Sequence, residues 1–192
     1  MTNRKLAIFV SGNGTNMENI LKEIKAGRIP AEAALVVSDN PGAYALKRAE
    51  KTNVECVVTE RKNFPSKEAF EAEIRRHLER KKIDYIILAG FMRILSPGFV
   101  RAFPKRILNV HPALLPKFPG AHAIRDAWEA KEKVTGVTIH YVDEGVDTGP
   151  AILQREVRID PKDTLESLEK KVHAVEYELY PEAINLVLEG KK

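Results

Sequence analysis

The sequence predicts an α/β fold, namely a single-domain, Rossmann-like, mostly parallel twisted sheet with helices on both faces and an antiparallel C-terminal strand addition. Three observations lead to this fold class. Short apolar runs alternate with amphipathic stretches through the first half of the chain, which is typical of a parallel sheet covered on both faces. Two β-like segments then follow one another with only a loop between them. The length of 192 residues fits one domain better than two.

The order of the elements follows from these patterns. Strands are expected at residues 6–10, 34–37, 54–58, 85–89, 106–111, 136–142 and 151–157. Helices are expected at residues 17–25, 43–51, 66–82, 96–103 and 164–188. In the first helix Met17, Ile20 and Leu21 form an apolar stripe at helical spacing. Ser66 is a residue type that begins helices, and it supplies the N-terminus of the helix expected at residues 66–82.

Composition excludes several classes of protein. The chain has 31 Lys and Arg against 27 Asp and Glu, and the two signs are interleaved. The densest basic stretch, residues 75–82, follows acidic residues at helical spacing, which indicates a solvated helix face rather than a nucleic-acid patch. The longest apolar run, residues 85–92, is far shorter than the roughly 20 residues of a membrane helix. The single cysteine, Cys56, cannot form an internal disulfide, so the sequence predicts a cytoplasmic protein. The charge pattern and the short apolar runs predict no nucleic-acid or membrane partner.

The loop between the first strand and the first helix, residues 11–16, reads Ser-Gly-Asn-Gly-Thr-Asn. Its glycines let the backbone approach a ligand, and the N–H groups of a helix N-terminus attract an anion, so a phosphate site is expected. The alternative is a tight turn in which Thr15 or Asn16 caps the helix. The loop is a poor dinucleotide fingerprint, because Met17 occupies the third glycine position of G-x-G-x-x-G. A monophosphate therefore fits better.

Asn109 and His111 close the fifth expected strand, and side chains two residues apart in a strand point the same way. An amide N–H stabilises an oxyanion, while an imidazole moves a proton or polarises the same oxygen. Asp147 is the candidate partner, because a nearby carboxylate favours protonated His111. Alternatively, the pair is a strand-end asparagine and a core or solvated histidine. Metal ligation is not expected, since Asp143, Glu144 and Asp147 lack calcium-loop spacing.

Four segments occur together in one order: residues 11–16, 89–97, 108–116 and 136–150. They resemble the folate-dependent formyltransferases, and among them the phosphoribosylglycinamide formyltransferases. The resemblance implies transfer of the formyl group of 10-formyltetrahydrofolate, the cosubstrate, to the amino group of glycinamide ribonucleotide in de novo purine (IMP) biosynthesis. It also implies direct transfer without a metal, two small-molecule substrates, and a monomer or homodimer.

The resemblance also implies a role for particular residues. The catalytic residues correspond to Asn109, His111 and Asp147. The substrate-binding residues correspond to Gly14, Thr15 and Asn16 at the phosphate and Glu176 at the ribose. The folate-binding residues correspond to Lys67, Met92, Arg93, Ile94, Leu95 and Asn109. Two positions depart from the family pattern: Lys67 replaces an arginine that relatives can carry, and His173 replaces a lysine near the phosphate.

The same resemblance implies one formyltransferase domain over residues 1–192. Its nucleotide-phosphate half covers about residues 1–100, and its catalytic and folate-binding half covers about residues 85–192. Methionyl-tRNA formyltransferase and formyltetrahydrofolate deformylase are alternatives with the same Asn-x-His and Asp core, but each resembles a longer chain with an added domain. A dinucleotide-binding module is a further alternative, which would use Gly12, Gly14 and Asp39.

Overall fold

The computed structural model describes residues 4–192 and has the predicted α/β architecture. Seven strands are hydrogen-bonded in the order β3-β2-β1-β4-β5-β6-β7, and the last two are antiparallel. The chain divides between Leu108 and Asn109 into two compact units. Strand β5 (Ile107–His111) crosses this division. The predicted fold class, a mostly parallel sheet with an antiparallel C-terminal addition, is confirmed.

The first unit is built on four parallel strands, β1 (Arg4–Val10), β2 (Ala31–Ser38), β3 (Cys56–Val58) and β4 (Tyr85–Leu88). β1 pairs with β2 on one side and with β4 on the other, and β2 pairs with β3. Residues 6–10 of β1 are completely buried. This burial explains why the strand is a continuous apolar run rather than an alternating one.

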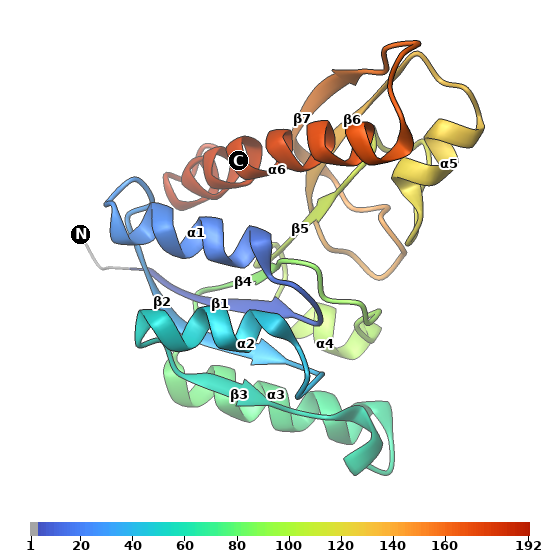
Figure 1. The fold of residues 1–192 in the computed structure, drawn as a ribbon. Helices are drawn as coiled ribbons and strands as arrows, with labels where there is room; N and C mark the ends of the chain where they lie inside the picture. The colour runs from blue at the N-terminus through green and yellow to red at the C-terminus, as the bar shows by residue number, and fades with distance from the viewer. Residues whose placement is uncertain (1–3) are drawn as a thin grey trace. The chain divides into compact units, whose positions relative to one another are not determined.

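Helices cover both faces of this parallel sheet (Figure 1). α1 (Thr15–Lys25) and α2 (Tyr44–Ala49) lie on one face, and α3 (Lys67–Lys81) lies on the other. α4 (Pro97–Ala102) follows β4. Short 3-10 turns occupy Glu50–Thr52 and Arg61–Asn63. Because β1 to β4 are parallel, their carboxyl ends lie at one edge of the sheet, which is where ligands bind in folds of this kind.

The basic stretch of α3 is a solvated helix face, as predicted. Arg76 pairs with Glu73 at 2.6 Å, and Arg80 pairs with Glu55 at 2.6 Å. Leu78 between them is buried. Ser66 caps this helix, because its Oγ accepts the Ala69 N–H at 3.1 Å. The positive charges of α3 are therefore largely matched by neighbouring carboxylates.

The second unit contains the antiparallel pair β6 (Val134–Tyr141) and β7 (Ala151–Arg158), covered by α6 (Leu165–Leu188) (Figure 1). α6 begins at a capping box between Thr164 and Ser167. The sequence patterns do not predict α5 (Ala123–Glu129), a helix of two turns whose N-cap residue, His122, makes no side-chain capping bond. Among the described residues no helix has the length and apolarity that crossing a bilayer requires.

Candidate active site

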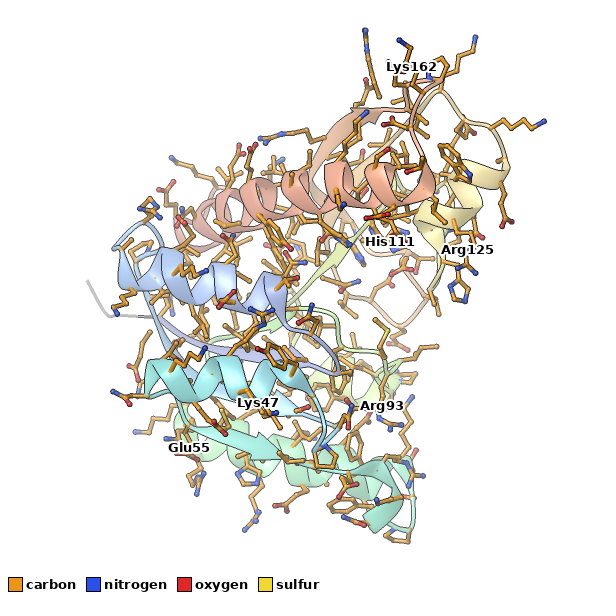
Figure 2. All side chains as sticks on the ribbon, viewed as in Figure 1. Lys47, Glu55, Arg93, His111, Arg125 and Lys162 are labelled. Carbon is orange, nitrogen blue, oxygen red and sulfur yellow. The ribbon has the colours of Figure 1, made fainter. Side chains whose placement is uncertain are left out.

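The three residues expected to act together lie in the second unit, Asn109 and His111 on β5 and Asp147 in the loop between β6 and β7. His111 (Figure 2) is 3% exposed. Its Nδ1 lies 3.3 Å from Asp147 Oδ2. The structure thus brings together an imidazole and a carboxylate that are far apart in the sequence.

Both ring nitrogens of His111 face oxygen atoms that only accept hydrogen bonds. Nε2 lies 2.7 Å from the main-chain carbonyl oxygen of Phe118, and Nδ1 faces the carboxylate of Asp147. A doubly protonated imidazolium donates to both oxygens, whereas a neutral ring donates to one and places a lone pair against the other. These surroundings therefore suit the positively charged form of His111.

Asp147 is held as an ionised carboxylate. Its backbone has φ 55°, the left-handed region that residues other than glycine seldom adopt, and its Oδ2 accepts the Gly120 N–H at 2.9 Å. Burial raises the pKa of Asp147, but the contact with His140, the Gly120 N–H and the charge of His111 outweigh it and lower that pKa. A negative charge is consequently fixed beside His111 at neutral pH.

His140, on β6, belongs to this cluster although the sequence patterns do not single it out. Its Nε2 lies 3.2 Å from Asn109 Nδ2 and 3.6 Å from Asp147 Oδ1. Its Nδ1 faces the Tyr141 carbonyl oxygen at 2.9 Å. When the ring donates only from Nδ1, Nε2 accepts one amide N–H of Asn109, and the amide has a second N–H for a ligand. When Nε2 carries a proton, it points that proton toward Asp147 instead. The alternation of β6, which puts Thr138 and His140 on one face, is the signal that could have found it.

The residues expected to bind phosphate lie together at the start of α1 in the first unit. The N-cap is Gly14, with φ 73°, so the alternative in which Thr15 or Asn16 caps the helix is wrong. A Cβ atom at Gly14 would lie 2.4 Å from the Cβ of Ala45, so only glycine fits there. Thr15 and Asn16 then form the first turn, where N–H groups and the helix dipole attract an anion.

A cavity of about 330 Å³ in the first unit gathers most of the expected folate residues. Its walls include Lys67, Met92, Arg93, Ile94 and Leu95. Met92 is 75% exposed and Ile94 is 63% exposed, although both are apolar. Exposed apolar side chains around a cavity suit a flat aromatic ligand. Asn109, the remaining expected folate residue, belongs to the second unit.

The segment that forms this wall is fixed at both ends. The Met92 N–H donates to Ser11 Oγ at 2.9 Å. At the other end the Ser96 N–H donates to the buried carboxylate of Glu71 at 2.7 Å. Because the Met92 N–H is already used, main-chain recognition of a ligand falls to the residues that follow it.

Asp39 is the residue that a dinucleotide-binding module would place at a ribose. Its side chain is 7% exposed, and Oδ2 accepts from Arg93 Nε at 2.5 Å. The Arg93 guanidinium (Figure 2) also lies 5.7 Å from the centre of the Phe70 ring. The carboxylate therefore fixes the wall of the cavity, which argues against the dinucleotide alternative.

Glu176 and His173 lie on α6 in the second unit. The carboxylate of Glu176 is buried, and its Oε2 lies 2.9 Å from His173 Nδ1. This hydrogen bond raises the pKa of His173. His173 consequently stays protonated to higher pH than an ordinary histidine.

The acidic loop between β6 and β7 is organised by its own residues. Asp143 Oδ1 accepts the Gly145 N–H at 3.1 Å and the Thr148 hydroxyl at 2.7 Å. Within residues 4–192 no group of three or more His, Cys, Asp or Glu side chains is arranged to hold a metal ion.

The sequence matches the family model described as "Formyl transferase" over residues 4–184. The chain belongs to the formyl transferase family. It is 43% identical to phosphoribosylglycinamide formyltransferase of Bacillus subtilis (strain 168) over 185 residues, 96% of this chain and 95% of that relative. It is 41% identical to the trifunctional purine biosynthetic protein adenosine-3 of Drosophila melanogaster, of which it spans 14% of the length.

The solved structures similar to this formyl transferase agree with its fold. The crystal structure of phosphoribosylglycinamide formyltransferase from Bacillus Halodurans has a TM-score of 0.95 and 48% identity, covering 98% of this chain and 97% of that one. The glycinamide ribonucleotide transformylase 1 from Geobacillus kaustophilus has a TM-score of 0.94 and 49% identity, covering 97% of this chain and 99% of that one.

Proposed function

We propose that this formyl transferase moves the formyl group of 10-formyltetrahydrofolate to the amino group of glycinamide ribonucleotide, in de novo purine biosynthesis. The observation that carries the proposal is the cluster of buried His111 with Asp147, to which His140 links Asn109, in a chain that covers nearly the whole of relatives named for this reaction. The cluster combines an amide donor, a cationic imidazole and a carboxylate, which are the groups that acyl transfer to an amine requires.

The proposed mechanism is direct transfer through a tetrahedral intermediate. The amine of the nucleotide attacks the formyl carbon, and the carbonyl electrons move onto oxygen. The second amide N–H of Asn109 and the Nε2–H of His111 stabilise this oxyanion, which replaces the Phe118 carbonyl oxygen as the acceptor for His111. The intermediate then collapses as the bond to N10 of the folate breaks, and the proton lost by the amine passes to N10.

The negative charge of Asp147 lies beside the His111 ring during these steps, with Oδ2 3.3 Å from Nδ1. We also propose that water carries the proton from the amine past this carboxylate. Because imidazolium and amide supply the polarisation of the formyl oxygen, no step calls for a metal ion.

The proposal also gives a role to each expected binding residue. Gly14, Thr15 and Asn16 hold the phosphate at the start of α1. Glu176 holds the ribose, and protonated His173 assists at the phosphate. The cavity lined by Lys67 and residues 92–95 holds the folate, with Asn109 as a further contact. The helix N-terminus and the exposed apolar rim of the cavity are the features that support these assignments.

We further propose that the whole chain acts as one domain, because one family model spans both units from residue 4 to residue 184. The small-molecule substrates are both anions, which the net charge of +4 favours. A cytoplasmic location and a monomeric or homodimeric state complete the proposal.

The reaction itself provides the test of this function. Purified protein mixed with glycinamide ribonucleotide and 10-formyltetrahydrofolate is expected to form the formylated nucleotide and tetrahydrofolate in equal amounts. Formation of no product above the uncatalysed background would contradict the assignment.

Asn16→Ala is expected to weaken nucleotide binding by about tenfold, since a hydrogen bond to a charged group contributes about 1.5–3 kcal/mol. The folate cavity is formed by other segments, so folate affinity is expected to stay within about twofold of the wild type. Isothermal titration with each ligand measures both affinities. Equal losses for the two ligands would contradict a phosphate site at the start of α1.

His140→Ala is expected to lower kcat by about tenfold with little change in either KM, because the Asn109 amide loses the acceptor that orients it toward the oxyanion. His140→Gln, which restores an acceptor, is expected to recover part of the rate. His122→Ala removes an exposed imidazole of the same unit and serves as the control. A wild-type kcat for His140→Ala would show that Asn109 needs no such support.

A further inference from the structure

The loop between β1 and α1 has all of its carbonyl groups engaged by the protein. The carbonyl oxygens of residues 11–14 accept hydrogen bonds from Asn40 Nδ2, the Ala45 N–H, Arg48 Nε and the Glu18 N–H, respectively. The four distances are 3.1, 3.1, 2.9 and 2.9 Å. An anion is attracted by N–H groups and repelled by carbonyl oxygens, so the loop suits an anion only while these carbonyls stay turned toward their donors.

Arg48 is the one charged donor among these four. Its Nε donates to the Asn13 carbonyl oxygen at 2.9 Å, and its Nη2 donates to Asn13 Oδ1 at 3.0 Å. Its Nη1 lies 2.8 Å from Glu18 Oε2 on α1. The planar guanidinium thus donates to two oxygens of Asn13, the main-chain carbonyl oxygen and Oδ1, and also pairs with α1, the helix that follows the loop. Lysine cannot reproduce this geometry.

The helix that carries Arg48 also supports the rest of the loop. At its start, the Ala45 N–H donates to the Gly12 carbonyl oxygen, and the Ala45 Cβ packs against Gly14, where a Cβ would come within 2.4 Å. Lys47, the neighbouring cation of α2 (Figure 2), lies over the Tyr44 ring at 5.9 Å, and the Arg48 guanidinium lies over the same ring at 4.9 Å. The two neighbouring cations differ in one respect. Among the hydrogen bonds found within residues 4–192, those to the loop come from Arg48 and not from Lys47.

We propose that Arg48 is a positioning residue for the phosphate of the nucleotide substrate. It holds the Asn13 carbonyl oxygen away from the anion, so that the N–H groups at the start of α1 face the phosphate. This role rests on the proposed function, because it requires that the loop of residues 11–16 bind the phosphate of glycinamide ribonucleotide.

The test compares three variants of the full chain: Arg48→Met, Arg48→Lys and Lys47→Met. Titration with inorganic phosphate gives the Kd, and steady-state kinetics gives kcat and the KM of each substrate. Arg48→Met is expected to raise the phosphate Kd and the KM for glycinamide ribonucleotide about tenfold. The kcat and the KM for the folate are expected to change less than about twofold, since a positioning role acts on binding of one ligand.

The two other variants separate geometry from charge. Arg48→Lys keeps the charge without the planar fork, and it is expected to remain at least about threefold weaker than the wild type for phosphate. Lys47→Met removes the same charge from the same helix and is expected to bind phosphate as the wild type does. Unchanged folate affinity and far-ultraviolet circular dichroism show that each variant is folded.

Several results would overturn the proposal. Equal weakening by Arg48→Met and Lys47→Met, or full recovery in Arg48→Lys, would mean that charge alone acts. A normal KM in Arg48→Met, with an active wild type, would reject the role of Arg48 and leave the proposed function intact. A wild type that binds no phosphate and does not formylate the nucleotide would overturn the proposed function, and the role of Arg48 with it.

Discussion

His111→Ala is expected to lower kcat for formyl transfer at least about a hundredfold, with less than about a threefold change in the KM of either substrate. The imidazole is buried, and both of its nitrogens face acceptor oxygens, one of them in the carboxylate of Asp147. It is therefore the positive charge closest to the proposed oxyanion within the cluster. Alanine removes both the charge and the donor, which act in the transition state more than in the ground state. Steady-state kinetics with both substrates measures the effect.

Two further variants make this result specific. His111→Gln keeps a neutral donor of similar reach and is expected to fall between the wild type and His111→Ala. His77→Ala removes an imidazole from the solvated face of α3, where it pairs with Glu73, and is expected to leave kcat unchanged. A nearly normal kcat for His111→Ala would contradict the proposed mechanism even if the overall reaction took place.

Asp147→Asn is likewise expected to lower kcat at least about a hundredfold. The amide is nearly the same size as the carboxylate, and its oxygen can still accept the Gly120 N–H that Asp147 accepts at 2.9 Å. What it lacks is the negative charge beside His111, 3.3 Å away, so the imidazolium loses its partner. Glu144→Gln, which changes an exposed carboxylate of the same loop, is the matched control and should keep the wild-type kcat.

The same substitution has a predicted effect on the pH dependence of stability. The pKa of Asp147 is lowered in the folded protein. Its ionised form therefore stabilises the fold above the unfolded-state pKa of about 3.9, and this contribution is lost as the pH falls through the lower, folded-state pKa. The free energies of unfolding of the wild type and Asp147→Asn, measured by urea denaturation, should differ most near neutral pH and converge in acid. A difference that does not vary with pH would contradict a lowered pKa at this residue.

The fold was predictable where the sequence carries local signals. β1 is a continuous apolar run because residues 6–10 are buried on both faces. The starts of α3 and α6 were readable because Ser66 and Thr164 are side-chain caps. α5 has no such cap, and so it was not predicted. The cap of α1 depends on the packing of Gly14 against Ala45, some thirty residues along the chain, which no local pattern reveals.

In the candidate site, too, some residues can be predicted from local sequence and others cannot. Asn109, His111 and Asp147 can be predicted because an amide, an imidazole and a carboxylate at the end of a strand and in a loop are residue types that carry out this chemistry. His140 and Arg48 cannot, since each matters through a hydrogen bond to one partner, Asn109 or Asn13, that is distant in sequence. Positions that bind are thus easier to predict from sequence than positions that hold another residue in place.

The most direct test of the central claim follows a labelled formyl group from 10-formyltetrahydrofolate when glycinamide ribonucleotide, methionyl-tRNA and water compete as acceptors. Under the proposed function the label is recovered in formylated glycinamide ribonucleotide, with one tetrahydrofolate formed for each labelled product. Label found in formylmethionyl-tRNA or in free formate, with none on glycinamide ribonucleotide, would contradict it.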